Sequence, residues 1–277
     1  MNRNNSKAKR KRLVLELKRF DTLIVAFSGG VDSTFLLAVA QEVLAEGVVA
    51  VTAESPAHPT REKESAIAMA RNLGIRHIVL QSKEISLPNF VANRKDRCYI
   101  CKKSFFEDLL KIASKMGIKH IAHGANVDDL EDFRPGFKAA QEMGIVAPMI
   151  NAGLTKDNIR LLSKNMLLET WNKPSMACLA TRIPYETPIT QKALKMVEQA
   201  EDVMITLGFL TCRVRHHGTV ARIEIVPSNF KKVLDEKIKA AIIRKFREIG
   251  FSHVTLDMEG YVQGKMNRSL QNELAFR

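Results

Sequence analysis

The sequence has no long apolar run: none of its stretches approaches the about 20 consecutive apolar residues that span a bilayer. Its basic first segment, residues 1–20, also lacks the apolar segment of a signal peptide. We therefore expect a cytoplasmic protein without a membrane partner.

Cysteine is scarce as well. Cys98, Cys101, Cys178 and Cys212 are too few and too unevenly spaced for the disulfide framework of a secreted protein. In a cytoplasmic protein, a CxxC pair with one distant cysteine more often indicates metal or redox chemistry. A structural zinc site is the alternative that the spacing leaves open.

Acidic residues are outnumbered, because 43 Lys and Arg against 30 Asp and Glu give a net charge of +13. Such an excess is typical of proteins that bind nucleic acids. The cations are mixed with acids along most of the chain, however, which favours a generally charged surface with a basic N-terminal arm. An anionic substrate such as a nucleotide would also use some of these cations.

Short apolar runs alternate with amphipathic stretches in the first half of the sequence. Mostly apolar strands separated by helices indicate a parallel sheet covered on both faces, so we expect an α/β fold with a doubly wound parallel sheet. The expected strands are 22–27, 48–54, 77–81 and 120–125, with a fifth at 145–150. The expected helices are 33–46, 60–73, 99–116 and 156–168, the first three ending at Gly47, Gly74 and Gly117.

The pattern changes after residue 170. A helix over 191–207, two strands in TCRVRHHGTVARIEIV, a helix over 230–249 and a strand in HVTLDM indicate a small C-terminal α+β domain. We therefore expect four segments: a basic N-terminal arm or helix (1–20), an α/β domain (21–170), a connector that carries Cys178 (171–189) and an α+β domain (190–277). The resemblance described below implies ATP binding for the second segment and substrate binding or oligomerisation for the fourth.

The stretch SGGVDS, residues 28–33, stands where the first strand turns into a helix. Its glycines let the backbone approach a ligand, and the N–H groups and dipole of the helix favour an anion there. Ser28 and Ser33 add hydroxyl donors for phosphate oxygens. A Walker loop would need a lysine, and the GxGxxG fingerprint is absent. The simpler alternative is a capped helix in a tight turn.

SGGVDS resembles the PP-loop of the N-type ATP pyrophosphatases, which bind ATP, adenylate a substrate and release pyrophosphate. The resemblance implies an adenine nucleotide α-hydrolase-like fold with ATP and Mg²⁺ as cofactors. Asp32 would help to hold the magnesium ion. The residues that would cradle the pyrophosphate are Ser28, Gly29, Gly30 and Ser33, and those that would border the adenosine are Ala53 and Gly124.

Further stretches resemble the LarE-type sulfur transferases over nearly the whole chain: HGANVDDLEDFRPGFKAAQEMGIVAPM, WNKPS, RIPY, CRVRHHGTVARIEI and HVTLDMEGYVQGKMN. These enzymes adenylate a carboxylate of a pyridinium bis-carboxylate mononucleotide and replace an oxygen with sulfur, a step in building the nickel-pincer cofactor. The resemblance implies a homo-oligomer such as a hexamer. It also places Asp129 and Arg134 in a loop that faces the nucleotide, and Arg182 and Glu201 near the sulfur-transfer site.

The best-known LarE proteins sacrifice a cysteine of their own. Aligning NKPSMACLATRIPY by its ends puts Ala177 at that position, with Cys178 beside it. RCYICKK offers another route, because Cys98 and Cys101 share one face at the start of a basic helix. With Cys178 they would leave one iron of a [4Fe–4S] cluster open, as in a subgroup of LarE-like proteins. That iron would carry a sulfide from a sulfur donor. A tRNA-thiolating enzyme with the same loop and cluster is the alternative function.

Alternation along TCRVRHH separates two faces of one strand. Cys212 shares a face with Val214, so we interpret Cys212 as a structural core residue. Arg213 and Arg215 share the other face and suit a substrate phosphate. A salt-bridged sheet surface with Arg222 and Glu224 is the alternative, and the LarE resemblance favours the phosphate.

Overall fold

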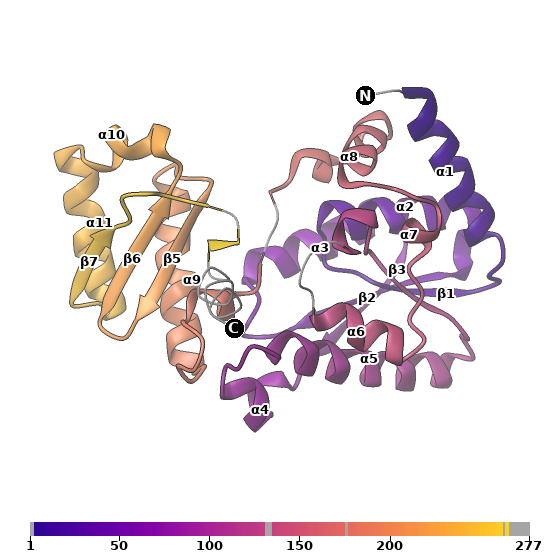
Figure 1. Ribbon diagram of the computed structural model, residues 1–277, viewed down its shortest axis with the longest axis horizontal. Helices are drawn as coiled ribbons and strands as arrows, with labels where there is room; N and C mark the ends of the chain where they lie inside the picture. Colours follow the sequence, from indigo (N-terminus) through magenta and orange to yellow (C-terminus); the bar gives the residue numbers. More distant parts are fainter. Residues whose placement is uncertain (1–2, 131–134, 175–176, 263, 266–277) are drawn as a thin grey trace, which may run out of the picture. The chain divides into compact units, whose positions relative to one another are not determined.

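The structure of the protein is a computed structural model that describes residues 3–130, 135–174, 177–262 and 264–265 (Figure 1). The chain forms two compact units. Unit 1 comprises residues 1–90 and 95–176, and unit 2 comprises residues 91–94 and 177–277. None of the helices in the described ranges has both the length and the apolar character to cross a membrane.

Unit 1 is built on a parallel sheet with the strand order β3-β2-β1-β4. The strands are β1 (Leu23–Ala26), β2 (Val48–Glu54), β3 (Arg76–Gln81) and β4 (Ile121–His123). β1 contains only apolar residues, as expected for a central parallel strand that is covered on both faces. Because β1 lies between β2 and β4, the loops that follow these three strands meet at one edge of the sheet.

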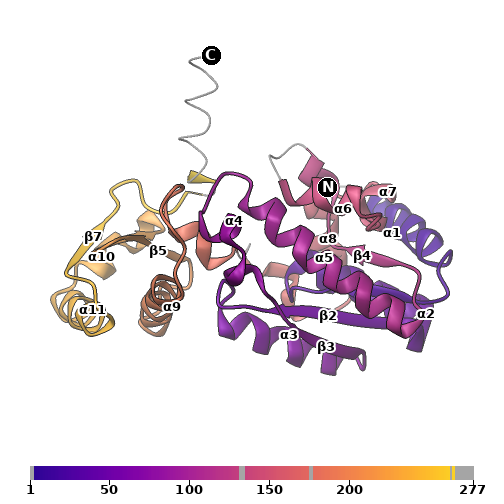
Figure 2. The same cartoon turned by 90° about the horizontal axis from the view of Figure 1, so that it is seen from below.

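Two layers of helices cover this sheet (Figures 1 and 2). α1, α2, α3 and α8 share one hydrophobic core, and α5 and α6 share the core on the other face. Leu13 and Leu17 of α1 are fully buried, so the basic N-terminal segment packs as a helix of unit 1. The helices of this part of the chain are α1 (Arg3–Leu17), α2 (Val31–Leu44), α3 (Thr60–Asn72), α4 (Pro88–Val91), α5 (Arg97–Met116), α6 (Pro135–Glu142), α7 (Pro148–Asn151) and α8 (Lys156–Asn165).

These elements confirm the predicted fold class, with two local corrections. The predicted strand at 145–150 is wrong: Val146 forms a single parallel bridge with Ala122, and Pro148 then starts α7. A proline fits the first turn of a helix, where its missing N–H group costs nothing. Gly47 does not end α2 either, because that helix stops at Leu44 and Ala45 adopts the left-handed φ of 48°.

Unit 2 contains a three-stranded sheet in the order β5-β6-β7. β5 (Cys212–His217) and β6 (Val220–Ile225) are antiparallel, whereas β7 (His253–Leu256) is parallel to β6. α9 (Gln191–Thr206) and α11 (Glu236–Ile249) contribute to its core together with the short α10 (Phe230–Val233). The predicted single helix at 230–249 is thus two helices, because the Asp235 carboxylate accepts the N–H groups of Lys237 and Ile238 and starts a new helix there.

Cys212 lies in the core of unit 2 with an exposed fraction of 2%. This burial confirms its interpretation as a structural residue.

Candidate functional site

The SGGVDS loop joins β1 to α2 and is fixed by its own hydroxyl groups. Ser33 Oγ accepts the backbone N–H of Ser28 at 3.2 Å and donates to the carbonyl of Gly30 at 3.3 Å. The N-cap residue of α2 is Gly30, which has no side chain that could cap the helix. The first N–H groups of a helix have no partner within the helix, so this end of α2 can bind an anion.

Two glycines allow other elements to approach this loop closely. Gly29 has a φ of 67°, and a Cβ atom there would lie 3.0 Å from the Cβ of Ala66 on α3. A Cβ atom on Gly124, directly after β4, would lie 2.9 Å from the backbone nitrogen of Ser33. The end of β4 therefore lies against the first turn of α2, and any side chain at position 124 would push the two apart.

Asp32 points to a second group of polar residues. Its carboxylate forms an ion pair with Lys156, the first residue of α8, and accepts a hydrogen bond from the Asn126 side chain at 3.4 Å. A Mg²⁺ ion that binds a nucleotide typically takes one or two protein carboxylates and completes its shell with phosphate oxygens and water. Asp32 supplies such a hard oxygen donor beside the anion-binding end of α2, so these residues fit a magnesium site.

Lys173 contacts the loop from the other side. Its ammonium group donates to the carbonyl of Gly29 at 3.1 Å and to Ser65 Oγ at 3.2 Å, and it pairs with Glu62 at 2.8 Å. Lys156 and Lys173 thus bring two cations to a loop that has no lysine of its own. Sequence reasoning missed both, because 124 and 144 residues separate them from their partners in the loop.

The residues expected near the adenosine lie at the same edge of the sheet. Ala53 is near the end of β2, the strand next to β1. Asp129 accepts the backbone N–H of Asn126 at 2.9 Å and so shapes the loop after β4. Arg134 lies outside the described residues.

Cys98 and Cys101 lie near the start of α5, the first exposed and the second half-buried, and neither forms a disulfide. Residues three apart share a helix face, so this pair fits two ligand positions of an iron–sulfur cluster. Cys178 belongs to unit 2, is half-buried and also forms no disulfide. Among the residues the structure describes, no group of three or more His, Cys, Asp or Glu side chains is arranged to hold a metal ion.

Two histidines of unit 1 are kept neutral near the start of α5. Burial, and secondly the charge of Lys102, lowers the pKa of His58 to about 4 and that of His123 to about 4. The Lys102 ammonium itself lies 5.6 Å from the ring centre of Phe105 and 5.9 Å from that of Phe106. Both imidazoles are therefore uncharged at neutral pH, and each has one nitrogen that donates and one that accepts a hydrogen bond.

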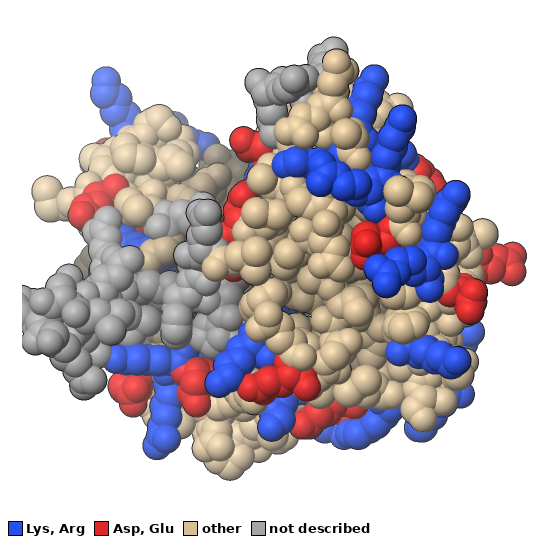
Figure 3. Space-filling model, turned by 45° about the vertical axis from the view of Figure 1, so that its right-hand side comes forward, with Lys and Arg blue, Asp and Glu red and all other residues tan. Residues whose placement is uncertain are grey.

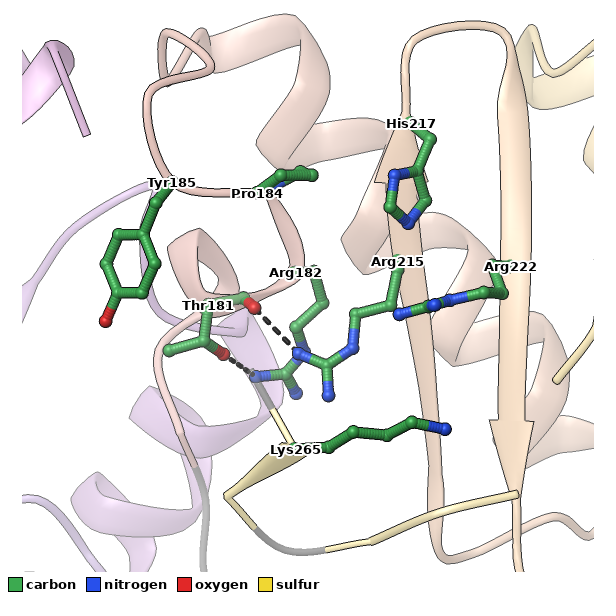
Figure 4. A pocket seen from close by; sticks show the side chains of 8 residues that line it. All are labelled: Thr181, Arg182, Pro184, Tyr185, Arg215, His217, Arg222 and Lys265. Atoms are coloured by element: carbon green, nitrogen blue, oxygen red, sulfur yellow. Dashed lines mark hydrogen bonds between the residues drawn. The ribbon is translucent and has the colours of Figure 1, made fainter. Parts of the chain in front are cut away.

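Unit 2 contains a pocket of about 300 Å³ (Figure 4). Two guanidinium groups meet beside Thr181: Arg215 donates to its carbonyl at 2.7 Å and Arg182 to its hydroxyl at 2.8 Å. Both are groups that recognise phosphate. The pocket is lined by Thr181, Arg182, Pro184, Tyr185, Arg215, His217, Arg222 and Lys265.

Buried acids hold these arginines in place. Glu201 and Arg182 are both fully buried and form a two-point ion pair at 2.8 and 3.0 Å. Glu224 holds Arg215 in the same way, at 3.0 and 2.7 Å, and also contacts Arg222. The sheet is therefore salt-bridged, as the alternative interpretation of this strand expected, and the pocket nevertheless has more cations than acids in its lining.

Of the predicted phosphate ligands, Arg182 and Arg215 line the pocket, whereas Glu201 lies behind Arg182 as its partner. Arg213 is absent from the lining and stacks over the Tyr261 ring at 5.3 Å. Burial, and secondly the neighbouring Arg182, lowers the pKa of Arg213. Tyr185 and Lys265 also line the pocket. They lie in the stretches RIPY and HVTLDMEGYVQGKMN that carry the family resemblance, but the sequence analysis assigned neither of them a role.

Comparison with known proteins places this arrangement in a family. The NAD synthase family model matches residues 7–119. An uncharacterized protein of Synechocystis sp. is 39% identical over 90% of this chain and 93% of its own length. The tRNA-specific 2-thiouridylase MnmA of Rickettsia felis is 29% identical over 55% of this chain, which spans about half of that enzyme.

The pyridinium-3,5-bisthiocarboxylic acid mononucleotide synthase of Lactiplantibacillus plantarum is 34% identical over 95% of this chain and 95% of its own length. Similarity of this extent covers both the ATP-binding loop of unit 1 and the arginine pocket of unit 2. The chain therefore belongs to the LarE-type, ATP-dependent sulfur transferases of the PP-loop superfamily.

Proposed function

We propose that the protein adenylates a carboxylate of a pyridinium bis-carboxylate mononucleotide and replaces one of its oxygens with sulfur, in nickel-pincer cofactor biosynthesis. The observation that carries the proposal is the pairing of an intact SGGVDS loop with similarity to a synthase of this product over 95% of the chain. AMP and pyrophosphate are the other products.

The ATP-dependent step uses the loop of unit 1. A substrate carboxylate oxygen forms a bond to the α-phosphorus, and the bond from that phosphorus to the bridging oxygen breaks, so pyrophosphate leaves with the electron pair. The N–H groups at the start of α2 and the hydroxyls of Ser28 and Ser33 bind the leaving pyrophosphate. Asp32 would hold a magnesium ion, which would neutralise charge on the phosphates.

The substrate phosphate binds the pocket of unit 2. Arg215 is held rigidly by Glu224, so little side-chain entropy is lost when its remaining N–H groups bind an anion. Arg182 is fully buried with its donors engaged by Glu201 and by neighbouring oxygens, so it contributes its positive charge from behind. Arg222 and Lys265 add positive charge to the lining. Arg213 acts through its neighbours, as a cation behind the pocket.

Cys98, Cys101 and Cys178 would hold a [4Fe–4S] cluster, which would supply the sulfide that replaces the carboxylate oxygen. The spacing of Cys98 and Cys101 on one helix face supports this assignment, as does Ala177 at the position of the sacrificial cysteine. Inorganic sulfide or another sulfur donor reloads the enzyme, which acts as a cytoplasmic homo-oligomer.

Metal analysis tests the cluster. Protein purified without oxygen should contain about four irons per chain, and Cys98→Ala should lose them. Cys212→Ala is the matched control, because Cys212 is buried in the core and should not affect iron content. Colourless protein with one bound zinc ion would show that the cysteines form a structural site instead.

Pyrophosphate release tests the ATP-dependent step. Asp32→Ala should reduce release from ATP about 100-fold or more, because the carboxylate that holds the metal is lost. Asp157→Ala on α8 is the control. Asp157 is exposed to solvent, so its loss should leave pyrophosphate release near the wild-type rate. Equal rates for Asp32→Ala and the wild type would refute adenylation at this loop.

A tRNA-thiolating enzyme is the second candidate. The similarity to MnmA and the basic residues of α1 favour it. It would use the same loop for adenylation but would need tRNA for turnover.

A further inference from the structure

Lys156 forms an ion pair with Asp32, the carboxylate that is expected to bind magnesium. Its ammonium group pairs with Asp32 Oδ2, and the Asn126 amide donates to Oδ1 of the same carboxylate at 3.4 Å. Both oxygens of Asp32 are therefore engaged by protein groups. The side chains of Lys156 and Asp32 are only 30% and 23% exposed, so the pair is partly shielded from water.

The position of Lys156 is fixed by its own helix end. Thr155 and Asn158 form a capping box at the start of α8, and the backbone N–H of Lys156 donates to Asp128 Oδ2 at 2.8 Å. Asn158 also donates to Ser6 on α1 at 3.0 Å. The lysine thus reaches the loop from a backbone anchored on two sides, and the ion pair with Asp32 is a built contact of unit 1.

The ion pair between Lys156 and Asp32 should respond differently to free Mg²⁺ and to Mg²⁺ bound to ATP. A free Mg²⁺ ion gives up its water reluctantly and would have to displace an ammonium ion from Asp32. An ion that arrives with ATP brings phosphate oxygens, which offer the displaced ammonium group a new anionic partner. ATP keeps a net negative charge after it binds one Mg²⁺ ion, so the exchange leaves Lys156 paired.

We propose that Lys156 is a nucleotide-site residue that exchanges partners: it holds Asp32 and weakens the binding of free divalent cations in the nucleotide-free protein, and it moves to the phosphates when the metal–ATP complex binds. The inference deepens the proposed function, since it rests on ATP binding at the SGGVDS loop. Lys156 acts on the metal through Asp32 and is therefore a positioning residue until the nucleotide arrives.

Direct binding measurements on the full chain test this exchange. Mn²⁺ binding to the nucleotide-free protein, followed by electron paramagnetic resonance, should be about fivefold tighter for Lys156→Met than for the wild type. Calorimetry with Mg²⁺ and a non-hydrolysable ATP analogue should show about fivefold weaker binding for the same variant. Lys156→Arg keeps the charge and should behave nearly as the wild type in both measurements.

Lys164→Met is the matched control. Lys164 lies on the same helix with its ammonium group 4.6 Å from the ring centre of Trp171, and its loss should change neither affinity. Unchanged Mn²⁺ affinity in folded Lys156→Met, with a circular dichroism spectrum like that of the wild type, would overturn the exchange. Failure of the wild type to bind the ATP analogue would instead overturn the proposed function.

Discussion

At the scale of single residues, His123 carries a prediction about pH. Its ring lies between Phe106 and Phe137, with ring centres 6.2 and 5.9 Å away, and Nε2 is buried without a partner among the described residues. Burial lowers its pKa to about 4, below the 6.5 of an unfolded chain. The neutral form favours folding, so this contribution to stability is present above pH 6.5 and is lost as the pH falls towards 4.

The free energy of unfolding should therefore decrease between pH 6.5 and pH 4, and His123→Leu should show a shallower decrease. Between pH 6.5 and pH 4, we expect the wild type to lose about 2 kcal/mol more of its free energy of unfolding than His123→Leu loses, allowing for partial exposure of the ring. Urea unfolding followed by circular dichroism at several pH values measures this. Parallel curves for the two proteins would mean that His123 is solvated and ionises normally.

The residue scale also separates what the sequence predicts from what it does not. SGGVDS and the glycine after β4 are local patterns, and local chemistry explains them. Lys156 and Lys173 have no such pattern, since each becomes a loop residue only through long-range packing of α8 and the segment after it. The family resemblance places Arg182 and Glu201 near the sulfur-transfer site, but their ion pair with each other depends on packing that no motif encodes.

At the scale of elements, the sequence predicts most helices and strands because their apolar periodicity is strong. The prediction from periodicity fails where a single residue starts a new helix. Pro148 ends the apolar run at 145–150, and Asp235 divides a long amphipathic pattern into α10 and α11. Both residues are recognised stop or start signals, so each correction has a cause that is visible in the sequence.

The pair of Arg182 and Glu201 also links elements: it joins the turn Leu179–Arg182 to α9, and Glu201 accepts the N–H of Val214 on β5 at 3.1 Å. Glu201→Gln should destabilise the protein by about 3 kcal/mol, because it leaves a buried arginine without its counter-ion. Glu248→Gln removes an exposed pair with Lys245 at 3.0 Å and should cost about 0.5 kcal/mol or less. Chemical unfolding measures both, and equal losses would mean that the buried pair is dispensable.

At the scale of the whole molecule, the net charge of +13 asks for an explanation. Figure 3, which brings the side with α1 forward, shows Lys and Arg side chains gathered in its upper right part. The helix α1 exposes Lys7 and Lys11, the exposed Lys18 follows it directly, and Glu16 is the single acid of the helix. This surface can attract any polyanion, so charge alone does not distinguish a tRNA substrate from non-specific binding.

Salt dependence and turnover together make that distinction. Weak binding of tRNA through α1 should fall by about three orders of magnitude between 50 and 200 mM salt, as counterion release requires. Replacing Lys7, Lys11 and Lys18 with glutamine should weaken that binding further. Pyrophosphate release from ATP with the mononucleotide substrate should stay within about twofold of the wild type, because none of the three lysines contacts the SGGVDS loop. If tRNA instead stimulates pyrophosphate release at physiological salt, and the mononucleotide does not, the chain is a tRNA-thiolating enzyme and α1 is part of its substrate site.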